Sequence, residues 1–342
     1  STQPSTDPFQ ILRYCDRQYA AELIAVALLH LDLFSWLERE TGATLGKILD
    51  QFGIYERPTD VMLTLCRANG FIETNYDGLN RLTQLGREYL VVGSPWYLGP
   101  YYQPIRDTPI TEGFLRVLKT DKLANWQAKE DGEDWHESML SADFAQGFTD
   151  LMNCRGLACG QALASGLSKL LVGCSRVLDI GGGSGIYAST LVAAHPSLEA
   201  IVFEQAPVDA IVAQEIVRHE LNDRVTVAQG DMFLDPWPEG ADAVLLSNVL
   251  HDWGTTEMKA LLVKAGIYLP EGGLLIIHGA FMNADKSGPL PVAEYSALLM
   301  NITQGKCYST SEYAAVLETL GFEVAPYQDT IADRGFMTAV KR

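Results

Sequence analysis

The sequence predicts an α/β protein in which a mainly α-helical N-terminal region precedes a doubly wound parallel sheet. With 342 residues, the chain is long enough for two domains. From Arg176 onward, short apolar segments with strand character alternate with segments of helical periodicity, and this alternation is typical of a parallel sheet covered by helices on both faces. A glycine-rich turn at 181–185 follows the first of these strands, as in folds that bind nucleotide-like cofactors.

The C-terminal half supplies the elements of this sheet. We expect strands at 177–180, 200–203, 225–229, 243–247 and 273–278, and helices at 186–194, 208–219 and 256–265. Parallel strands end at one edge of a sheet, and open sheets bind ligands there. Polar residues that directly follow these strands are therefore the candidates for a site.

In the N-terminal third, the sequence predicts a helix over about 11–40. Residues 20–37 of this helix are apolar on so many sides that we expect them to be buried against a partner. A helix at 44–52 capped by Thr44, a helix from Pro58 to Ala68, and strands at 71–74 and 79–83 follow. This order is typical of a winged helix. The second helix offers a DNA groove only Arg67 as a basic residue, so we favour a structural role.

Composition excludes several classes. Hydrophobic residues make up 47% of the chain, and the formal net charge is −18, which disfavours a nucleic-acid partner. No apolar run approaches the ~20 residues of a membrane span, and residues 1–8 lack the layout of a signal peptide. The six cysteines show neither metal-ligand nor disulfide-framework spacing. We expect a cytoplasmic protein without a metal, a nucleic-acid partner or a membrane partner.

Four motifs follow the predicted strands in order. They are the glycine turn, Phe203-Glu204, Gly230-Asp-Met-Phe233 and Leu250-His-Asp-Trp253. An acid such as Glu204, about twenty residues beyond a glycine turn, can accept both hydroxyls of a ribose. The glycine turn alone also fits the loosened G-x-G-x-x-A pattern of a nicotinamide-dependent dehydrogenase, but no hydride-transfer motif such as Tyr-x-x-x-Lys is evident.

Taken together, the motifs closely resemble the S-adenosylmethionine-dependent O-methyltransferases of the caffeate and hydroxyindole type, over nearly the whole chain. The resemblance implies a Rossmann-like cofactor domain at 166–342, a winged-helix dimerisation domain at 1–100 and a helical linker at 101–165. It implies a homodimer that exchanges helices, a small aromatic hydroxyl compound as methyl acceptor, and S-adenosylhomocysteine as a product.

The resemblance also assigns residues. Those expected at the cofactor are Asp179, Gly181, Gly183, Gly185, Glu204, Gln205, Asp231, Met232, Phe233 and Ser247. Those expected at the acceptor are Phe144, Phe148, Met152, His278, Leu299 and Ile302. The spacing i, i+4, i+8 of the first three is equally that of a core stripe. The family more often carries aspartate at position 204, and Ser247 replaces a lysine that packs near the adenine in plant members.

His251 matches the general base of the family and is expected to act with Asp252. An imidazole with a pKa near 6.5 is mostly neutral at pH 7 and can accept a phenol proton. Two glutamates that flank the base in plant members are His278 and Cys307 here, so Asp252 or Glu294 would have to orient it. Two alternatives stay open: C- or N-methylation of a metabolite such as a keto acid, with a metal on His251, Asp252 and His278, or a cofactor-binding protein without transfer.

Overall fold

The structure, a computed structural model, describes residues 3–123 and 139–342, which form two compact units. One unit contains the large sheet and comprises 3–10, 139–281 and 310–342. The other is mainly helical and comprises 11–123 and 282–309. This division differs from the boundaries that we predicted at residues 100 and 165. The segment 282–309 leaves the sheet unit because its apolar helix packs among the N-terminal helices.

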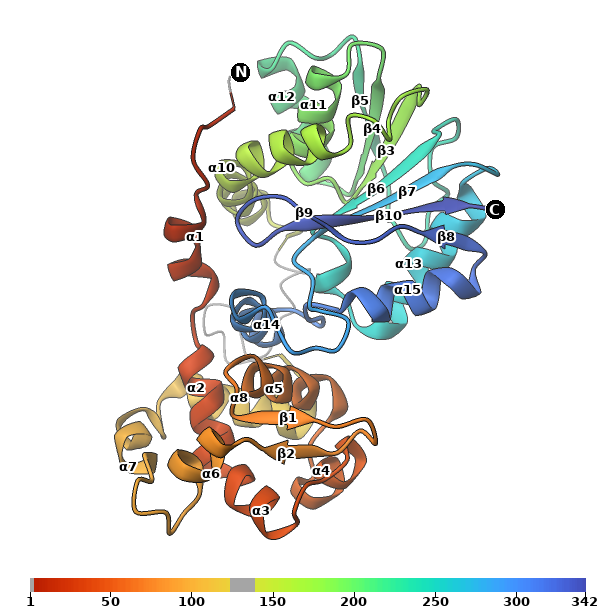
Figure 1. Cartoon of the computed structure of the whole chain (residues 1–342). Coiled ribbons are helices and arrows are strands. Elements are labelled where there is room, and N and C mark those ends of the chain that lie inside the picture. Colours follow the sequence, from red (N-terminus) through yellow and green to blue (C-terminus); the bar gives the residue numbers. More distant parts are fainter. Residues whose placement is uncertain (1–2, 124–138) are drawn as a thin grey trace. The chain divides into compact units, whose positions relative to one another are not determined.

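The sheet unit has the doubly wound order β5-β4-β3-β6-β7-β10-β8, with β9 paired to β10 (Figure 1). Five strands are parallel: β3 (Arg176–Ile180), β4 (Glu199–Glu204), β5 (Val225–Gln229), β6 (Ala243–Ser247) and β7 (Leu274–Gly279). All five match predicted strands to within a residue. The strands β8 (Phe322–Val324), β9 (Gln328–Asp329) and β10 (Gly335–Lys341) are antiparallel additions that we did not predict.

Helices cover both faces of this sheet. In Figure 1, α10 (Ala142–Gly166), α11 (Ile186–Ala194) and α12 (Val208–Arg218) lie on one face, and α13 (Thr255–Tyr268) and α15 (Thr310–Thr319) lie on the other. The predicted helices at 186–194, 208–219 and 256–265 are therefore confirmed, with shifts of up to three residues at their ends. Strand order reverses between β3 and β6, which is where ligands bind in doubly wound sheets.

In the described residues, the helical unit is built from helices that precede the sheet and from α14 of the later segment, and α1 begins two residues before the unit. The bounds are α1 (Phe9–Asp16), α2 (Ala20–Ala25), the π-helical turn η1 (Val26–His30), α3 (Leu33–Arg39), α4 (Leu45–Phe52), α5 (Glu56–Ala68), α6 (Gln84–Leu90), α7 (Gly99–Tyr102), the 3-10 turn η2 (Gln103–Ile105), α8 (Pro109–Thr120) and α14 (Leu290–Ile302). The strands β1 (Ile72–Thr74) and β2 (Asn80–Leu82) form an antiparallel hairpin after α5. Thr44 caps α4 as predicted, since its hydroxyl accepts from Lys47 N at 3.3 Å.

Two expectations for the first helices are wrong. The single helix predicted over 11–40 is broken, because Tyr19 and Asp32 adopt left-handed backbone conformations with φ of 71° and 47°. The apolar residues of 20–37 are buried inside the same chain rather than left for a partner. Over the described ranges no single helix is long and apolar enough to cross a membrane, although α2–η1 and α3 together, bent by 50°, meet the length and composition test.

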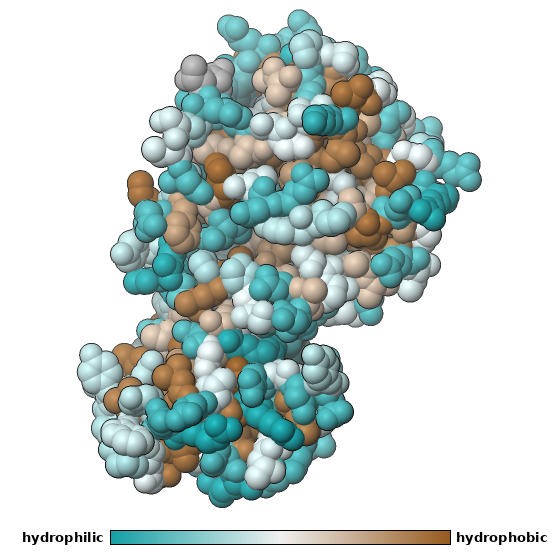
Figure 2. Space-filling view, viewed as in Figure 1, coloured by the Kyte–Doolittle hydropathy of each residue, from teal (hydrophilic) through white to brown (hydrophobic). Residues whose placement is uncertain are grey.

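Hydrophobic side chains nevertheless reach the surface of the helical unit, as Figure 2 shows for one face. Five exposed residues of this kind fall within 85–101, namely Leu85, Val92, Trp96, Leu98 and Tyr101. We call this segment the α6–α7 apolar segment. Clustered exposed apolar side chains are a common mark of interaction surfaces.

Glycines allow α10 to approach α11 closely. A Cβ placed at Gly160 would lie 2.4 Å from Thr190 Oγ1, and one at Gly156 would lie 2.6 Å from Ile186 Cγ2. Both distances are too short for a real contact, so the two helices pack at this separation only because the glycines have no side chain. The exposed Gly147 of the same helix has nothing within 4 Å of its Cβ position.

We expect Gly160→Ala to lower the free energy of unfolding by ~1–3 kcal/mol relative to Gly147→Ala, because only the first methyl group overpacks an interface. Both substitutions gain the same helix propensity, about 1 kcal/mol, so their difference isolates the clash. Urea unfolding followed by circular dichroism would measure it. Equal stability of the two variants would show that α10 moves away from α11 at little cost.

Candidate active site

The glycine turn connects β3 to α11 and has the backbone shape of a ligand cradle. Gly181, Gly183 and Gly185 have φ of 62°, 59° and 74°, a region that side chains disfavour. A Cβ at Gly182 would lie 2.7 Å from Asp179 Oδ2. On α10, Asn153 Oδ1 accepts from the hydroxyl of Ser184, so this turn is tied to the helix beside it. The N-terminus of α11 follows at once, and the first N–H groups of a helix have no partner within the helix.

Glu204 ends β4 next to this turn. Its Oε2 accepts from Gly183 N at 3.1 Å, and its Oε1 accepts from Gln205 N at 2.9 Å. Burial raises the pKa of Glu204 to about 7 and the pKa of Asp179 to about 8. Glu204 is therefore anchored by the turn at a strand end, and its predicted contact with a ribose stays a prediction.

The loop after β5 forms a tight turn that meets the loop after β6. Asp231 Oδ1 accepts from Phe233 N at 2.7 Å and from Leu234 N at 3.1 Å. The ring of Phe233 packs edge-on against Trp253 with centroids 4.7 Å apart. The structure therefore brings two of the predicted motifs into contact. Asp231 and Met232 are half-buried beside this turn.

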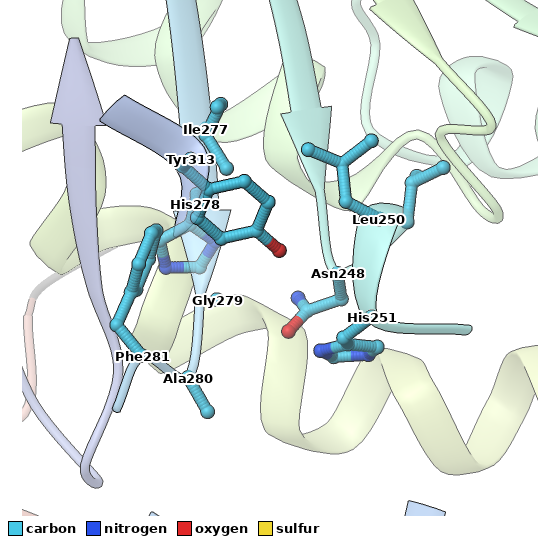
Figure 3. Close-up of a pocket in the computed structure, with 10 residues that line it drawn as sticks. Asn248, Leu250, His251, Ile277, His278, Gly279, Ala280, Phe281 and Tyr313 are labelled. Carbon is cyan, nitrogen blue, oxygen red and sulfur yellow. The ribbon is translucent and has the colours of Figure 1, made fainter. Parts of the chain in front are cut away.

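A pocket opens between the carboxyl ends of β6 and β7. Its lining residues are Asn248, Val249, Leu250, His251, Ile277, His278, Gly279, Ala280, Phe281 and Tyr313. In Figure 3, Asn248 and His251 lie on one side, and His278, Phe281 and Tyr313 lie on the other. The exposed fractions of His251 and His278 are 5% and 2%, so both imidazoles are removed from bulk water.

His251 is neutral in this setting. Burial, together with the positive charges of Arg334 and Arg155, lowers its pKa to about 3. Asp252 Oδ1 lies 3.7 Å from His251 Nε2, and burial raises the pKa of Asp252 well above its usual value. The side chain next in sequence is thus close to the imidazole but is not held as a carboxylate. Its predicted part in catalysis stays a prediction.

His278 belongs to a polar network that the sequence did not suggest. Its Nδ1 lies 2.8 Å from Ser247 Oγ. The amide of Asn248 donates to Tyr187 Oη at 3.1 Å and to Ser247 Oγ at 3.3 Å. The ring of Tyr187 lies 5.1 Å from that of His278. Ser247, predicted at the cofactor, therefore bonds to the predicted acceptor residue His278, and its cofactor contact stays a prediction.

Phe144, Phe148 and Met152 lie on one face of α10 and are half-buried. The first two rings stack with centroids 6.3 Å apart. The core positions of the helix are other residues: Ala145, Thr149, Gly156, Cys159, Gly160, Leu163 and Ala164. The three predicted acceptor residues therefore do not form a core stripe. Whether they contact the acceptor stays a prediction.

Sequence reasoning missed four residues of this site: Tyr187, Asn248, Arg155 and Arg334. Arg334 is 2% exposed, precedes β10 and acts electrostatically on both histidines. No motif points to it, because it enters the site through an antiparallel strand that was not predicted. Asn248 directly follows the predicted strand 243–247, so its polar side chain at a strand end was an available signal, whereas Tyr187 lies in the predicted helix 186–194.

The remaining predicted residues lie in the helical unit. Leu299 is buried there on α14, and Ile302 is half-buried. Glu294 Oε2 lies 3.6 Å from the guanidinium of Arg13, and Cys307 N donates to Ser296 Oγ at 3.0 Å. Their predicted roles at the acceptor and at His251 stay predictions. In the described part of the chain, no group of three or more His, Cys, Asp or Glu side chains is arranged to hold a metal ion.

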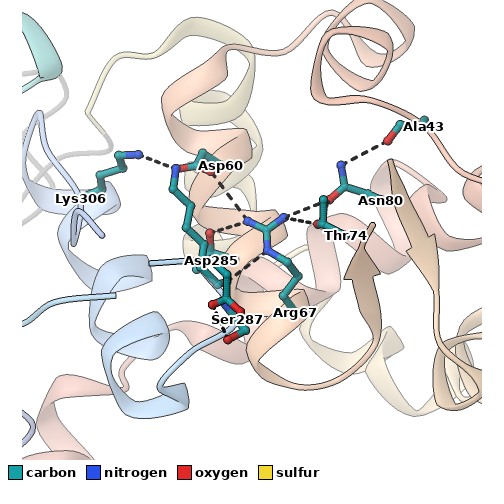
Figure 4. A network of polar contacts seen from close by, with 10 residues as sticks. Ala43, Asp60, Arg67, Thr74, Asn80, Asp285, Ser287 and Lys306 are labelled. Carbon is teal, nitrogen blue, oxygen red and sulfur yellow. Dashed lines mark hydrogen bonds and ion pairs between the residues drawn. The ribbon is translucent and has the colours of Figure 1, made fainter. Parts of the chain in front are cut away.

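A second buried polar cluster, in the helical unit, ties the segment 282–309 to α5 (Figure 4). Asp60 accepts from Lys286 and from Lys306. Burial alone would raise the pKa of Asp60, but the two ammonium groups hold it below its usual value. Arg67 donates to Lys286 O at 3.2 Å and to Asn80 Oδ1 at 3.0 Å. These bonds join α5 to the segment 282–309, so we assign the cluster to folding of this unit.

A glycine cradle, a strand-end carboxyl group and a neutral buried imidazole lie at one edge of a doubly wound sheet, an arrangement that suits an enzyme with a nucleoside cofactor. The comparisons with known proteins agree. Residues 124–323 match the sequence model of the O-methyltransferase domain. The chain is 33% identical to 3-hydroxy-5-methyl-1-naphthoate 3-O-methyltransferase of Streptomyces sahachiroi, over 79% of this chain and 77% of that one.

Two further likenesses cover more of the chain. It is 30% identical to L-tyrosine C(3)-methyltransferase of Streptomyces lavendulae, over 88% of this chain and 83% of that one. An O-methyltransferase family 2 protein from Planctomyces limnophilus, crystallised with apigenin, has a TM-score of 0.87 and 30% identity, with 100% and 98% of the two chains covered. The chain belongs to the O-methyltransferase family and is an S-adenosylmethionine-dependent methyltransferase.

We expect methyl transfer to stay constant as the pH falls from 7.5 to 5.5. A base whose pKa is lowered to about 3 remains unprotonated over this range, whereas an ordinary imidazole with a pKa near 6.5 would lose about tenfold at pH 5.5. The measurement is kcat at saturating cofactor with a phenol of pKa near 10. Circular dichroism at both pH values controls for unfolding, because Glu204, with a pKa of about 7, changes its charge over this range and can alter cofactor binding. A midpoint near 6.5 at saturating cofactor would contradict the expectation.

Proposed function

We propose that the enzyme methylates a hydroxyl group of a small aromatic compound and that His251 accepts the hydroxyl proton. One observation carries this proposal: a buried, neutral imidazole lines a pocket at the same sheet edge as the glycine turn. The two O-methyltransferase relatives support an aromatic acceptor, since one is named for a hydroxynaphthoate and the other was crystallised with apigenin. Phe144, Phe148 and Met152 would contact its ring.

The glycine turn also indicates which residues would contact the cofactor. The turn 181–185 would approach the cofactor with its backbone, Glu204 and Gln205 would face the ribose, and Asp231, Met232 and Phe233 would lie at the adenine. Asp179 and Ser247 were predicted beside them. When bound, S-adenosylmethionine supplies an electrophilic sulfonium methyl group. The protein has two tasks: to hold the acceptor oxygen in line with that group and to receive the proton.

His251 is suited to receive the proton because it is neutral and therefore carries one unprotonated ring nitrogen. A pKa of about 3 makes it a weak base toward a free phenol. The same positive charges that lower this pKa, Arg155 and Arg334, also stabilise an acceptor oxygen as it becomes negative. Proton acceptance during attack, rather than before it, fits both facts.

Methylation at carbon is the second candidate, because one relative, 30% identical over 88% of this chain, is named as a C(3)-methyltransferase. The same base could remove a proton on either path. The chemical shift of the new methyl group in the product separates the two, since O-methyl and aryl C-methyl protons resonate in different regions.

We also propose a homodimer formed through a winged-helix region of the helical unit, in a cytoplasmic protein. The α6–α7 apolar segment supports it: Tyr101 is 84% exposed, and Trp96 is 57% exposed. Light scattering should give twice the chain mass, and Trp96→Glu should shift it toward the monomer by charging the interface. Leu234→Glu, at an exposed apolar residue of the sheet unit, should not. A wild-type monomer would contradict the proposal.

Two variants should distinguish the role of the base from the role of the cofactor cradle. We expect His251→Ala to keep S-adenosylhomocysteine binding within a few-fold but to lose ~10²–10⁴ in turnover, because it removes the proton acceptor. Glu204→Ala should weaken S-adenosylhomocysteine binding at least about tenfold, since ribose hydrogen bonds to a carboxyl group are lost. Calorimetry measures the binding, and formation of S-adenosylhomocysteine with a panel of phenols measures turnover.

Glu204→Gln is the matched control for Glu204→Ala. It keeps the size of the side chain and one acceptor oxygen, so its affinity for S-adenosylhomocysteine should lie between those of the wild type and Glu204→Ala. Unchanged turnover in His251→Ala would show that positioning alone drives transfer. Failure of the wild-type protein to bind S-adenosylhomocysteine would overturn the placement of the cofactor.

A further inference from the structure

The residues expected at the adenine lie on one turn of the chain after β5, Asp231–Asp235, which we call the capped turn. Asp231 caps its start, since Oδ1 of this side chain accepts from Phe233 N at 2.7 Å and from Leu234 N at 3.1 Å. Asp235 closes it: its N–H donates to Asp231 O at 3.0 Å, and its Oδ2 accepts from Asp231 N at 2.8 Å. The N–H groups of the capped turn are thus bonded within the turn itself.

The carbonyl groups of the capped turn are held by one side chain of α13. Lys264 Nζ donates to three of their oxygens: Met232 O at 2.8 Å, Phe233 O at 3.2 Å and Asp235 O at 2.6 Å. An ammonium group has three hydrogens, so these bonds use all of them. Burial lowers the pKa of Lys264, but the carboxylates of Asp231 and Asp235 act in the opposite direction. The capped turn is therefore closed by a carboxylate at one end and by an ammonium group at the other, as the orphan groups of a helical turn favour.

Two aromatic side chains complete this attachment to α13. Trp237 Nε1 donates to Met232 O at 3.0 Å, so this oxygen accepts from both Trp237 and Lys264. The ammonium group lies 5.3 Å from the centroid of the Trp237 ring, within the range of a cation–π contact. Tyr268 follows Lys264 by one turn of α13, packs edge-on against the same ring at 5.6 Å, and donates to Pro238 O at 2.6 Å. The position of the capped turn is thus set by α13.

The capped turn places its side chains at the cofactor cradle. Met232 Sδ lies 3.7 Å from the Cβ position of Gly181, the first residue of the glycine turn, and the ring of Phe233 packs on Trp253. In the part of the chain that the structure describes, Asp231 Oδ1 accepts the two capping bonds and Oδ2 accepts none. Adenine carries an amino group that can donate to such an oxygen. The capped turn therefore sets where a base would find this acceptor.

We propose that Lys264 is a positioning residue for recognition of the adenine base: it fixes the capped turn so that Asp231 and Met232 meet the base, and it contacts no cofactor atom itself. This role rests on the proposed function, which places the adenine at 231–233. The ammonium group then determines how well the protein distinguishes adenine from a base that lacks the amino group. A structural role alone would change stability and leave this distinction intact.

The test compares S-adenosylhomocysteine with its purine analogue, in which a hydrogen atom replaces the amino group of adenine. Calorimetry on the full chain gives both dissociation constants. We expect the wild type to bind the adenine compound about tenfold more tightly, because the analogue leaves the carboxylate oxygen of Asp231 without its donor. Equal affinities in the wild type would contradict the placement of Asp231 at the base and would overturn the role of Lys264 with it.

Lysine variants then assign the preference. Lys264→Met keeps the length of the side chain but removes the ammonium group, so it should weaken S-adenosylhomocysteine binding about tenfold and bring the ratio of the two dissociation constants close to one. Lys264→Arg keeps a cation with several N–H donors and should restore part of the ratio. Lys259→Met, at an exposed lysine of the same helix, is the matched control and should bind both compounds as the wild type does. A ratio in Lys264→Met equal to that of this control would overturn the proposal.

A second variant and a second measurement distinguish positioning from a folding defect. Trp237→Phe keeps an aromatic ring but removes the hydrogen bond to Met232 O, and it should lower the same ratio by a smaller factor. If Lys264→Met does not fold, an unchanged ratio in Trp237→Phe overturns the proposal. In turnover of a phenol that the wild type methylates, Lys264→Met should raise the KM for S-adenosylmethionine about tenfold and keep kcat within a few-fold. A loss of kcat at an unchanged KM would contradict a role at the base.

The outcomes separate this proposal from the one on which it rests. If the wild type binds neither S-adenosylhomocysteine nor its purine analogue, the placement of the cofactor itself is wrong. If the wild type prefers the adenine compound and both lysine-to-methionine variants keep that preference, only the role of Lys264 is wrong. Circular dichroism of each variant confirms that the fold is intact in every comparison.

Discussion

The parallel register of β3, β4, β6 and β7 is the constraint on which the site depends. In-register pairing places Ile180 opposite Phe203 and Ser247 opposite His278, so these strands end together. The chain then makes its glycine turn beside Glu204, and Gly181 N donates to Phe203 O at 2.9 Å. A shift of one residue in a strand would turn these side chains to the other face of the sheet. Cradle, carboxyl group and imidazoles are thus positioned by one backbone pattern.

Burial controls the charge of the groups collected at this edge. It raises the pKa of Glu204 to about 7 and lowers the pKa of His251 and of His278 to about 3. Acids and bases both move toward their neutral forms, as desolvation requires. Arg155 and Arg334 remain positive and act on both histidines. The site therefore favours a developing negative charge on the acceptor over a permanently charged catalytic pair.

The sequence predicted the parallel strands well because buried strands are continuous apolar runs with polar residues at their ends. The glycine turn, Glu204 and His251 follow from the same rule, since each stands directly after such a run. Arg334 could not be found in this way, because it lies directly before β10, an antiparallel strand that was not predicted. The bonding of Ser247 to His278 depends on pairing between strands and is invisible in either segment alone.

The division into two compact units differs from the predicted boundaries for a related reason. The predicted cofactor domain was continuous to the C-terminus, whereas the chain leaves the sheet unit after Phe281 and returns at Thr310. Phe281 and Tyr313 lie at these two crossings, pack edge-on with centroids 5.5 Å apart, and line the pocket. Lys286 and Lys306, which lie in the segment between these two residues, bind Asp60 of α5 in the helical unit. The two lysines are more than two hundred residues away from Asp60 in the sequence, so no local pattern indicates that they bind it. That these contacts hold the segment 282–309 in the helical unit can be seen only in the structure.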